Sequence, residues 1–579
     1  MRGAPPGHSL HMRIHVTAIV AVLATAVAAA PSLAATPIPE GPNSLPAFTG
    51  KPAKPAPVFA PEAPRHPHMA PNGRSNIHDD GYMSDTYQGA GPLGNGITRT
   101  STFLSHECAS ITFDSKDRLV SICVGLEAPI LEMFDPKTLD SLASMTLPPR
   151  QTAPSGAFTD FSGGGYFYLD DKDRVIAPTS SRHIYVIGET DAPAFELQHD
   201  YDLTSVVPQG DKIISTLPDW AGRIWFASSA GIVGFVDPAN GAVKSIDTKE
   251  AIGNSFSVDE TGGVYIVTDK AMYRFDASPS GVATTWREVY DNTGVKKPGQ
   301  TEFGSGTTPT VMGPDYVAIT DNADPMDVVV YKRAASVSGS RLVCKVPVFS
   351  KGASDTDQSL IATPTSIVVE NNYGYSGPAA TEQGKTTTPG LERIDVDSKG
   401  CHKVWHSDEI SPSAVAKLSL ANGIVYTYSK PASSSGEDGW YLSAIDFASG
   451  RTLWRALGGE GLGFNNNYAP VTLGPDSSAY IGVLGGLVRL ADAKPAPPVA
   501  IKPKLRLNVR RFHDGRRRLS VGGSDRRYVR NVVYKSGKKR IGRSSKSPFR
   551  VVLRTRAKSV KAFVTMTDGR RFTLARKLR

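Results

Sequence analysis

Long apolar runs are almost absent from the 579-residue sequence. The exception is MRIHVTAIVAVLATAVAAAPSLA at 12–34, where Arg13 and His15 precede an apolar run that ends in small residues. That run is shorter than a bilayer span, which argues against a membrane anchor, and its pattern is typical of a secretory signal peptide. We therefore expect residues 1–34 to be a signal peptide, cut after Ala34. Because the residue directly after the cleavage site is not Cys and no later stretch is both apolar and long enough to cross a bilayer, we predict an exported protein, secreted or associated with the cell wall.

Cysteine is scarce: the sequence has four, an even number that suits disulfides in an exported chain. In SHECASITFDSKDRLVSICVG the expected turn lies midway between Cys108 and Cys123, so these two residues should face each other across a hairpin. Cys344 and Cys401 lie in RLVCKV and GCHKVW, which are equivalent outer strands of successive repeats. We predict the second disulfide between them.

Several catalytic signatures are also missing. There is no Walker loop, dinucleotide fingerprint, zinc signature or nucleophile elbow. The Gly-rich FSGGGYF at 161–167 leads into an expected strand, so it lacks the helix N-terminus that would hold a phosphate. Histidines that would serve as acid–base groups occur singly, and we interpret each of them as structural: His106, His183, His199, His402 and His406.

A helical period is missing as well, and a repeat of about fifty residues takes its place. Each copy has an apolar strand, a turn rich in Asp, Gly or Asn, and a second strand rich in Val, Ile and Tyr. The eight copies lie at 110–124, 165–179, 214–228, 255–269, 308–320, 360–371, 416–429 and 468–483. Such units cannot bury both faces alone, so we predict an all-β body, an eight-bladed β-propeller over 101–492. The alternative is two separate β-sandwiches.

The stretch AIDFASGRTLW at 444–454 joins two expected strands of one repeat. Asp446 can accept turn N–H groups, Gly450 supplies the left-handed conformation, and Trp454 is expected to fill the wedge between blades. We therefore assign a structural docking role to Ala444, Asp446, Gly450 and Trp454.

This stretch resembles the tryptophan-docking motif of pyrroloquinoline quinone propellers, and the count of eight units matches them. The resemblance is sharp at Ala444, Asp446, Ser449, Gly450, Arg451 and Trp454. It implies the propeller fold. Enzymes of that family commonly carry a vicinal Cys pair beside the cofactor, which this sequence lacks. We therefore carry over the fold, expect no cofactor, and keep a quinoprotein-type oxidoreductase as an alternative.

Loops on one face of the expected propeller gather carboxylates and amides. The segments are 320–327, 370–390, 429–440 and 463–470. Their oxygens would suit Ca²⁺ or the hydroxyls of a glycan, although such residues also form ordinary solvated turns. A metal-dependent, lactonase-like hydrolase would use the same oxygens to polarise a substrate. The metal candidates are Asp321, Asn322, Asp324, Glu370, Asn371 and Asn466.

The two ends of the mature chain differ from its body. Residues 35–100 begin with a Pro-rich stretch that predicts an extended, solvated linker, and its His66, His68, His78, Asp79 and Asp80 are then linker residues, not metal ligands. A Pro-Ala hinge at 493–503 precedes residues 504–579, whose short strands predict a small Ig-like domain.

Charge is concentrated in that last domain. Residues 501–579 contain 27 Lys and Arg against Asp514, Asp525 and Asp568, a net of +24; with +10 for the whole chain, residues 1–500 carry −14. A basic domain of this kind can hold cell-wall polymer, acidic polysaccharide or nucleic acid, or can compensate the acidic body. The sequence therefore predicts a secreted β-propeller that acts as a binding or scaffold protein at the cell surface, with a glycan or a protein as partner of the propeller face. An enzyme is the alternative.

Overall fold

The structure is a computed structural model that describes residues 3, 33–42, 45–150, 158–160, 162–497, 499–555 and 557–578. The expected signal peptide, residues 1–34, lies outside the described residues except for Gly3, Leu33 and Ala34. In the described part strands dominate, and the helices are short 3-10 turns: η2 (Pro378–Thr381), η3 (Leu462–Phe464) and η4 (Ser524–Tyr528). None of the helices described is long and apolar enough to cross a bilayer.

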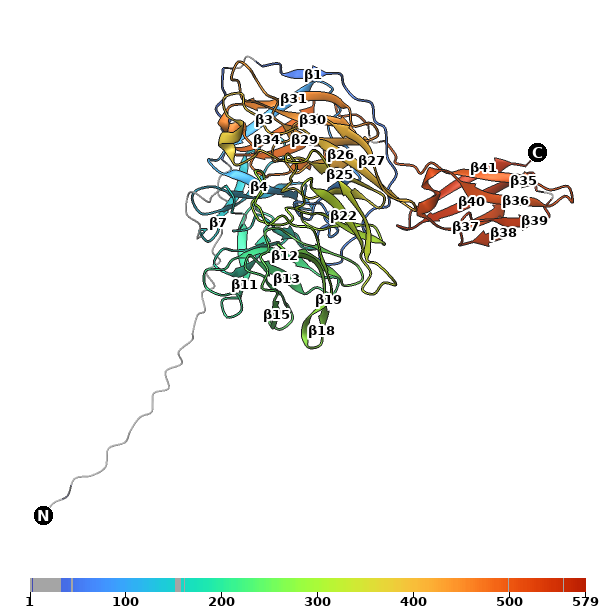
Figure 1. Ribbon diagram of the computed structural model, residues 1–579, viewed down its shortest axis with the longest axis horizontal. Coiled ribbons are helices and arrows are strands. Elements are labelled where there is room, and N and C mark those ends of the chain that lie inside the picture. Colours follow the sequence, from blue (N-terminus) through green and yellow to red (C-terminus); the bar gives the residue numbers. More distant parts are fainter. Residues whose placement is uncertain are drawn as a thin grey trace.

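Eight consecutive sheets, antiparallel except for the short β2–β28 pairing in the seventh, form the body of the described chain (Figure 1). Each of the first six has four strands from one region of the chain, the last two also take strands from the N-terminal part, and we number the sheets 1 to 8 in chain order. Sheet 1 contains β4 (Glu107–Phe113), β5 (Leu119–Val124), β6 (Ile130–Phe134) and β7 (Ser141–Thr146), and sheet 2 contains β8 (Tyr168–Leu169), β9 (Val175–Pro178), β10 (His183–Glu189) and β11 (Phe195–Asp202). Sheet 3 contains β12 (Ile213–Pro218), β13 (Ile224–Ser228), β14 (Ile232–Val236) and β15 (Val243–Asp247). Sheet 4 contains β16 (Ser257–Val258), β17 (Val264–Val267), β18 (Ala271–Ser278) and β19 (Gly281–Val289).

Sheets 5 to 8 complete the series, and two of them recruit strands from the N-terminal part of the chain. Sheet 7 gains β1 (Phe48–Gly50) and β2 (Thr86–Tyr87) at its edges, and sheet 8 takes β3 (Ile97–Phe103) as its fourth strand. Sheet 5 contains β20 (Thr310–Met312), β21 (Tyr316–Thr320), β22 (Asp327–Lys332) and β23 (Leu342–Pro347), and sheet 6 contains β24 (Ile361–Thr363), β25 (Ser366–Glu370), β26 (Leu391–Asp397) and β27 (Gly400–Ser407). The other strands of sheet 7 are β28 (Lys417–Ser419), β29 (Ile424–Ser429), β30 (Gly439–Asp446) and β31 (Thr452–Glu460). Those of sheet 8 are β32 (Val471–Leu473), β33 (Ala479–Val483) and β34 (Gly486–Asp492).

Apolar clusters join each sheet to the next, and the last sheet to the first. Phe113 and Leu119 of sheet 1 pack against Tyr480 and Leu487 of sheet 8, so the series closes on itself. Backbone hydrogen bonds close the ring as well, because β3, which precedes sheet 1 in the chain, pairs with β34 of sheet 8 along its whole length. This propeller-like ring confirms the all-β prediction and excludes two separate sandwiches. Each of the eight predicted repeats covers the first two strands of one sheet.

The turn in AIDFASGRTLW is built as a docking site for the neighbouring sheet. The N–H of Gly450 donates to the Asp446 carbonyl at 2.8 Å, and Gly450 has φ 74°. Trp405 of sheet 6 lies against Gly450, where a Cβ would be 2.6 Å from the indole, and its Nε1 donates to the Phe447 carbonyl at 2.9 Å. Trp454 in turn is 1% exposed in the cluster that joins sheets 7 and 8.

Both predicted disulfides are present in the structure. Cys108 and Cys123 are direct cross-strand partners in β4 and β5. Cys344 and Cys401 lie in β23 and β27, the outermost strands of sheets 5 and 6, so this disulfide links two successive sheets.

The prediction that the Pro-rich stretch at the start of 35–100 is a solvated linker is wrong, because the Ala56 and Val58 N–H groups donate to the Asn422 and Leu420 carbonyls of sheet 7 at 2.8 and 2.9 Å. The extension that follows is also part of the ring. Residues 70–85 follow the inner strands of the ring and exchange backbone hydrogen bonds with five sheets. The pairs are Ala70 N with Leu169 O, Val258 N with Gly81 O, Val311 N with Tyr82 O, Ala362 N with Ser84 O and Leu418 N with Asp85 O, all at 2.8–2.9 Å. The prolines misled the prediction because they stop at Pro71 and resume at Pro92, which leaves the intervening backbone free to donate. β3 also begins before the predicted propeller boundary at 101.

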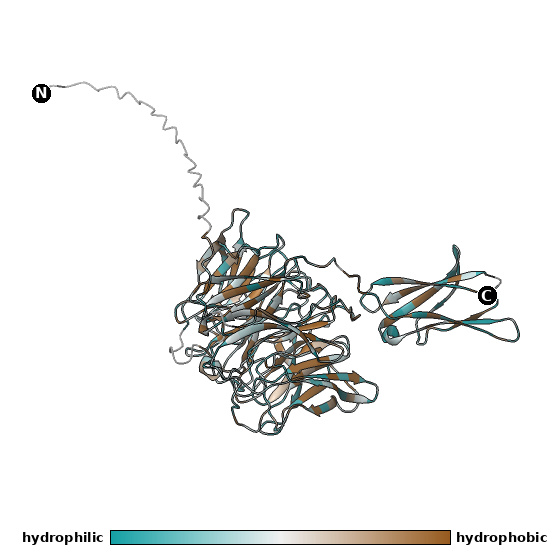
Figure 2. Cartoon of the chain, turned by 90° about the horizontal axis from the view of Figure 1, so that it is seen from above, coloured by the Kyte–Doolittle hydropathy of each residue, from teal (hydrophilic) through white to brown (hydrophobic). Residues whose placement is uncertain are grey.

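A separate module of two antiparallel sheets occupies the C-terminal end of the chain, beside the ring (Figure 1). Along its strands hydrophobic and hydrophilic residues alternate, as the colours of Figure 2 show, which places one face of each sheet in a shared core. Phe59, from the N-terminal segment, belongs to that core and lies 5.8 Å from Phe572. The strands are β35 (Arg506–Arg511), β36 (Arg517–Gly522) and β39 (Val551–Leu553) in one sheet, and β38 (Lys539–Ser544), β37 (Val529–Ser536), β40 (Ser559–Met566) and β41 (Arg571–Lys577) in the other.

Candidate functional site

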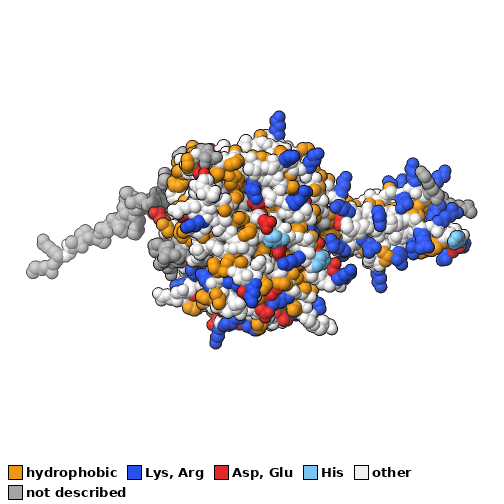
Figure 3. All heavy atoms as spheres, turned by 45° about the horizontal axis from the view of Figure 1, so that its top comes forward, with side chains coloured by type: hydrophobic (Ala, Val, Ile, Leu, Met, Phe, Trp, Pro, Cys, Tyr) orange, Lys and Arg blue, Asp and Glu red, His pale blue; other side chains and the backbone are white. Residues whose placement is uncertain are grey.

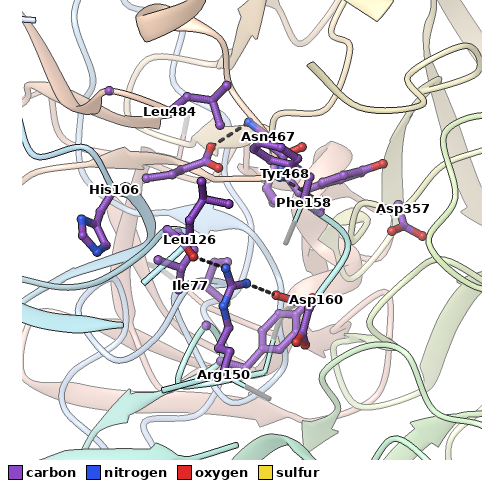
Figure 4. A pocket seen from close by; sticks show the side chains of 18 of the residues that line it. Ile77, His106, Leu126, Arg150, Phe158, Asp160, Asp357, Asn467, Tyr468 and Leu484 are labelled. Atoms are coloured by element: carbon purple, nitrogen blue, oxygen red, sulfur yellow. Dashed lines mark hydrogen bonds between the residues drawn. The ribbon is translucent and has the colours of Figure 1, made fainter. Parts of the chain in front are cut away.

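A cavity of roughly 400 Å³ is lined by segments from several sheets (Figure 4). The N-terminal segment supplies one part of its wall through Ile77 and His78, and the connection before β4 supplies another. The predicted 463–470 stretch lines it through Gly463, Asn467 and Tyr468. We call this space the axial cavity, because its wall is shared by segments from several sheets.

The mouth of the axial cavity is apolar and exposed. Phe103, Leu126, Phe158 and Leu462 line the cavity with 43%, 72%, 40% and 53% of their surface accessible. Single exposed apolar side chains are common on protein surfaces, but a group around one opening marks a binding site. An apolar ligand surface would therefore be favoured at this mouth.

Glu107 and Arg150 belong to the polar part of the cavity wall, and Figure 4 labels Arg150 there. Glu107 is 4% exposed, and its Oε1 accepts the N–H of Asn467 at 2.7 Å. Burial raises the pKa of the Glu107 carboxyl to about 8, against the lowering effect of that hydrogen bond and of Arg150. The Arg150 guanidinium donates to the carbonyls of Asp160, at 2.8 Å, and Gly125.

Asp357 lines another side of the cavity and lacks a partner for one oxygen. Its Oδ2 accepts the Thr301 hydroxyl at 2.6 Å, whereas Oδ1 is buried with no hydrogen-bond partner in the described residues. Both carboxyl oxygens of Asp355, two residues earlier, are equally unpartnered. Burial raises the pKa of Asp357 to about 7 and that of Asp355 to about 8, the latter with help from the Asp357 charge.

His78 belongs to a buried network at the inner end of the cavity. Its Nδ1 lies 3.1 Å from Asp85 Oδ1 and 2.9 Å from Ser359 Oγ, and Asp85 also accepts Lys417 Nζ. Burial lowers the pKa of His78, so the ring is neutral near pH 7. The three residue types match a nucleophilic triad, but Ser359 and Asp85 approach the same ring nitrogen. A triad needs them on opposite nitrogens, so this arrangement does not activate the hydroxyl.

Three of the predicted metal candidates, Asp321, Asn322 and Asp324, follow β21 of sheet 5, and their side chains hydrogen-bond to other parts of the protein there. Asp321 Oδ1 accepts the N–H groups of Ala323 and Asp327 at 3.1 and 2.8 Å, and burial raises the pKa of its carboxyl to about 6. Asn322 Nδ2 donates to Asn292 Oδ1 and to two backbone carbonyls. Asp324 Oδ1 accepts the Gly352 N–H at 2.6 Å.

The remaining candidates act in the same way at other sheets. Glu370 accepts the Thr427 hydroxyl at 2.8 Å, Asn371 Nδ2 donates to the Ala353 carbonyl at 3.0 Å, and Asn466 Nδ2 donates to Ala469 and Gly482. None of the six candidates lines the axial cavity. Over the part of the chain that the structure describes, no three His, Cys, Asp or Glu side chains form a group suited to a metal. Ca²⁺ at these residues stays a prediction.

Sequence reasoning missed the polar residues of the cavity. Glu107 lies beside Cys108 in a strand, and Asp355 and Asp357 lie in the plain stretch SDTD, so no motif marks them. The 463–470 segment was the predicted site segment that lies in this region. His106, interpreted as structural, also lines the cavity, with Nδ1 2.9 Å from the Leu104 carbonyl.

Comparison with known proteins identifies relatives without assigning an activity. The chain is 30% identical over 349 residues to an uncharacterized protein of Archaeoglobus fulgidus, a match that covers 54% of this chain and 67% of the archaeal protein. It belongs to the same family as that protein. No family model matches the chain.

Two solved structures show more distant likeness. A streptogramin B lyase structure is 8% identical with a TM-score of 0.34, over 68% of this chain and 97% of that one. A chain of a mitotic checkpoint complex is 10% identical with a TM-score of 0.31, over 56% of this chain and 87% of that one. Both likenesses are too distant to transfer an activity.

Proposed function

We propose that the chain is an exported binding protein, an eight-bladed propeller that holds a small amphipathic molecule in its axial cavity. The observation that carries the proposal is the cavity of roughly 400 Å³ whose mouth exposes four large apolar side chains. Ligand sites have this character, with mostly apolar walls and a few polar groups that orient the ligand. Export is supported by the signal-like sequence and by two disulfides, which persist in oxidising compartments.

The polar groups of the cavity favour binding over catalysis. Arg150 donates to two backbone carbonyls, and His78 shares one nitrogen between Asp85 and Ser359. Groups held in this way by the protein itself position a ligand, whereas a nucleophile would need a base on its own hydroxyl. The metal-dependent hydrolase and the oxidoreductase are therefore the less supported alternatives.

Uptake of the neutral apolar dye N-phenyl-1-naphthylamine tests the proposal. We expect the dye to bind with increased fluorescence, and Leu126→Glu at the mouth to weaken binding about tenfold or more, because the dye would desolvate the new carboxylate. The matched control is Leu197→Glu, since Leu197 is 45% exposed in β11 and lies away from the cavity lining. Equal effects of the two substitutions, or no dye binding, would contradict the proposal.

The C-terminal module supports a second proposed role, attachment to an anionic polymer of the cell surface through an Ig-like domain. Asp514 pairs with Arg516 at 2.5 Å and Asp568 with Arg570 at 2.7 Å, both within the module. Asp525 accepts the Lys504 N–H at 2.6 Å. The three acidic residues of the module are therefore engaged locally, and Lys and Arg side chains spread over the face seen in Figure 3.

We infer that the charge of the module serves an external partner more than the acidic body. Among the described residues, no ion pair joins a Lys or Arg of the module to a carboxylate of the ring. The contacts between the two parts join no opposite charges: Phe59 enters the module core, and the Tyr528 hydroxyl lies 2.7 Å from Thr365 Oγ1. The Arg570 guanidinium donates to the neutral Ala60 carbonyl at 2.5 Å and to Gln88 Oε1 at 3.4 Å. This favours an external polyanion over compensation within the chain as the reason for the charge.

A further inference from the structure

The four-stranded sheet of the C-terminal module has one face in the module core and one face toward solvent. Along β40, Ala562 and Val564 are buried in that core, while the alternate residues Lys561 and Phe563 are exposed. Directly paired residues of neighbouring strands share a face of the sheet, so the printed register of β38, β37, β40 and β41 places the other residues of the solvent face.

The solvent face carries cations from all four strands and no acid. None of the strands β37, β38, β40 and β41 contains Asp or Glu. We define the module face by Phe563 and the five cations that share its side of the sheet: Lys535, Arg543, Lys561, Arg571 and Lys577. A polyanion can therefore lie across this face without meeting a like charge.

Phe563 lies in the middle of the module face. Its cross-strand partners are Val533 of β37 and Thr573 of β41, and Val533 is in turn paired with Arg543 of β38. The Phe563 side chain is 37% exposed, and Lys535 Nζ lies 4.9 Å from the centroid of its ring. The face thus presents an accessible aromatic ring surrounded by cations.

An aromatic ring and cations on one sheet face are the two elements with which proteins hold single-stranded nucleic acids. Bases stack on the ring, and backbone phosphates pair with Lys and Arg. A base that stacks on Phe563 takes the place of Lys535 over the ring. This exchange is favourable, because base stacking is stronger than an exposed cation–π contact and the released ammonium group can meet a phosphate.

We infer that the module face binds single-stranded nucleic acid, with a base stacked on Phe563 and the backbone phosphates on the surrounding Lys and Arg side chains. The inference rests on the proposed attachment role of the module and names the polymer to which it attaches. Every base has a π-surface, so this mode of binding tolerates any sequence.

Other polyanions use less of what the module face offers. An acidic polysaccharide presents hydroxyl groups along its length, which need acceptor side chains, and the strands of this sheet supply no carboxylate. Polyphosphate would engage the cations and leave Phe563 in water. A duplex keeps its bases stacked on one another. A preference for any of these polymers is a contrary outcome of the test.

Two oligomers of equal charge separate base stacking from phosphate binding: oligothymidylate and an abasic phosphodiester oligomer of the same length. Both are titrated against the full chain by fluorescence anisotropy at one salt concentration. We expect oligothymidylate to bind about fivefold or more tighter, because a single base stacked on an aromatic ring contributes that much. Phe563→Leu should abolish this preference and leave binding of the abasic oligomer unchanged, whereas Phe563→Tyr should keep it. Lys561→Gln should weaken both oligomers alike.

Phe303→Leu is the matched control, because Phe303 is a 55% exposed phenylalanine of the ring, between β19 and β20. It should keep the preference for oligothymidylate. If the two oligomers bind equally tightly, or if Phe563→Leu keeps the preference, the inference is overturned while the attachment role stands. Tighter binding of duplex DNA or dextran sulfate at equal charge would also overturn it. If none of these polymers binds, the attachment role and the inference fail together.

Discussion

Glu370 shows how a single buried side chain ties stability to pH. It is 4% exposed at the end of β25 and accepts the Thr427 hydroxyl, while its Oε2 has no partner in the described residues. Burial raises the pKa of its carboxyl from an ordinary 4.5 to about 8. The protonated Glu370 carboxyl stabilises the fold in full below the pKa of the unfolded chain. This contribution to the free energy of unfolding is lost as the pH rises through the folded pKa, because the carboxyl releases its proton at lower pH in the unfolded chain than in the folded ring.

Glu370→Gln removes this titration while it keeps the shape and the acceptor. We expect the free energy of unfolding of the variant, relative to the parent, to rise by about 1.4 kcal/mol per pH unit between 4.5 and 8. Above pH 8 the difference should be constant. Urea unfolding at a series of pH values measures it. A difference that does not change with pH would show that the carboxyl stays charged in the folded ring.

Sheet-to-sheet packing depends on side chains at the outer strands. Trp454 of β31 is 1% exposed, stacks on Phe48 of β1 with ring centroids 5.9 Å apart, and belongs to the cluster shared by sheets 7 and 8. It therefore links three elements: its own sheet, the next sheet and the N-terminal strand. Loss of the ring would leave a cavity at their junction.

Trp454→Ala should lower the free energy of unfolding by about 3 kcal/mol or more, from lost burial and the residual cavity. Thermal or urea unfolding of the full chain measures the change. Val289→Ala is the control, because that side chain is 69% exposed in β19 and its loss should cost less than about 0.5 kcal/mol. Comparable effects of the two substitutions would refute the docking role of Trp454.

The whole molecule combines an acidic ring with a module whose net charge is +24 over 501–579. Polyanion binding of this kind is driven by release of counterions, so its affinity falls linearly on a log–log plot against salt concentration. We expect the full chain to bind polyphosphate and DNA in this way, with little dependence on DNA sequence. Gln substitution of Lys538, Lys539 and Arg540, exposed at the β37–β38 hairpin, should weaken binding and reduce the slope by about 1–3.

The matched control removes the same charge from the ring, by Gln substitution of the exposed Lys137, Lys172 and Lys249. It should leave both affinity and slope unchanged. Equal losses in the control would show that net charge alone governs binding. Binding that does not respond to salt would show that the charge of the module has another purpose.

Local patterns in the sequence were sufficient to predict the repeating part of the fold. The alternation of apolar residues and the Asp-Gly turns predicted the first two strands of all eight sheets, because strand periodicity and turn chemistry act over a few residues. The hairpin symmetry around Cys108 and Cys123, and the equivalent strands of Cys344 and Cys401, predicted both disulfides for the same reason.

Tertiary structure alone decided the path of residues 70–85 and the position of the site. That segment has no repeat partner in the sequence, and its backbone hydrogen bonds go to strands that lie between 94 residues (Ser75 to Leu169) and 333 residues (Asp85 to Leu418) away in the chain. Glu107, Asp357 and Tyr468 carry no shared motif, since they meet only when the ring closes through β3 and β34. Strand periodicity and turn chemistry act between near neighbours in the chain and are visible in the sequence, whereas burial and convergence at the axis depend on distant segments and arise only in the folded ring.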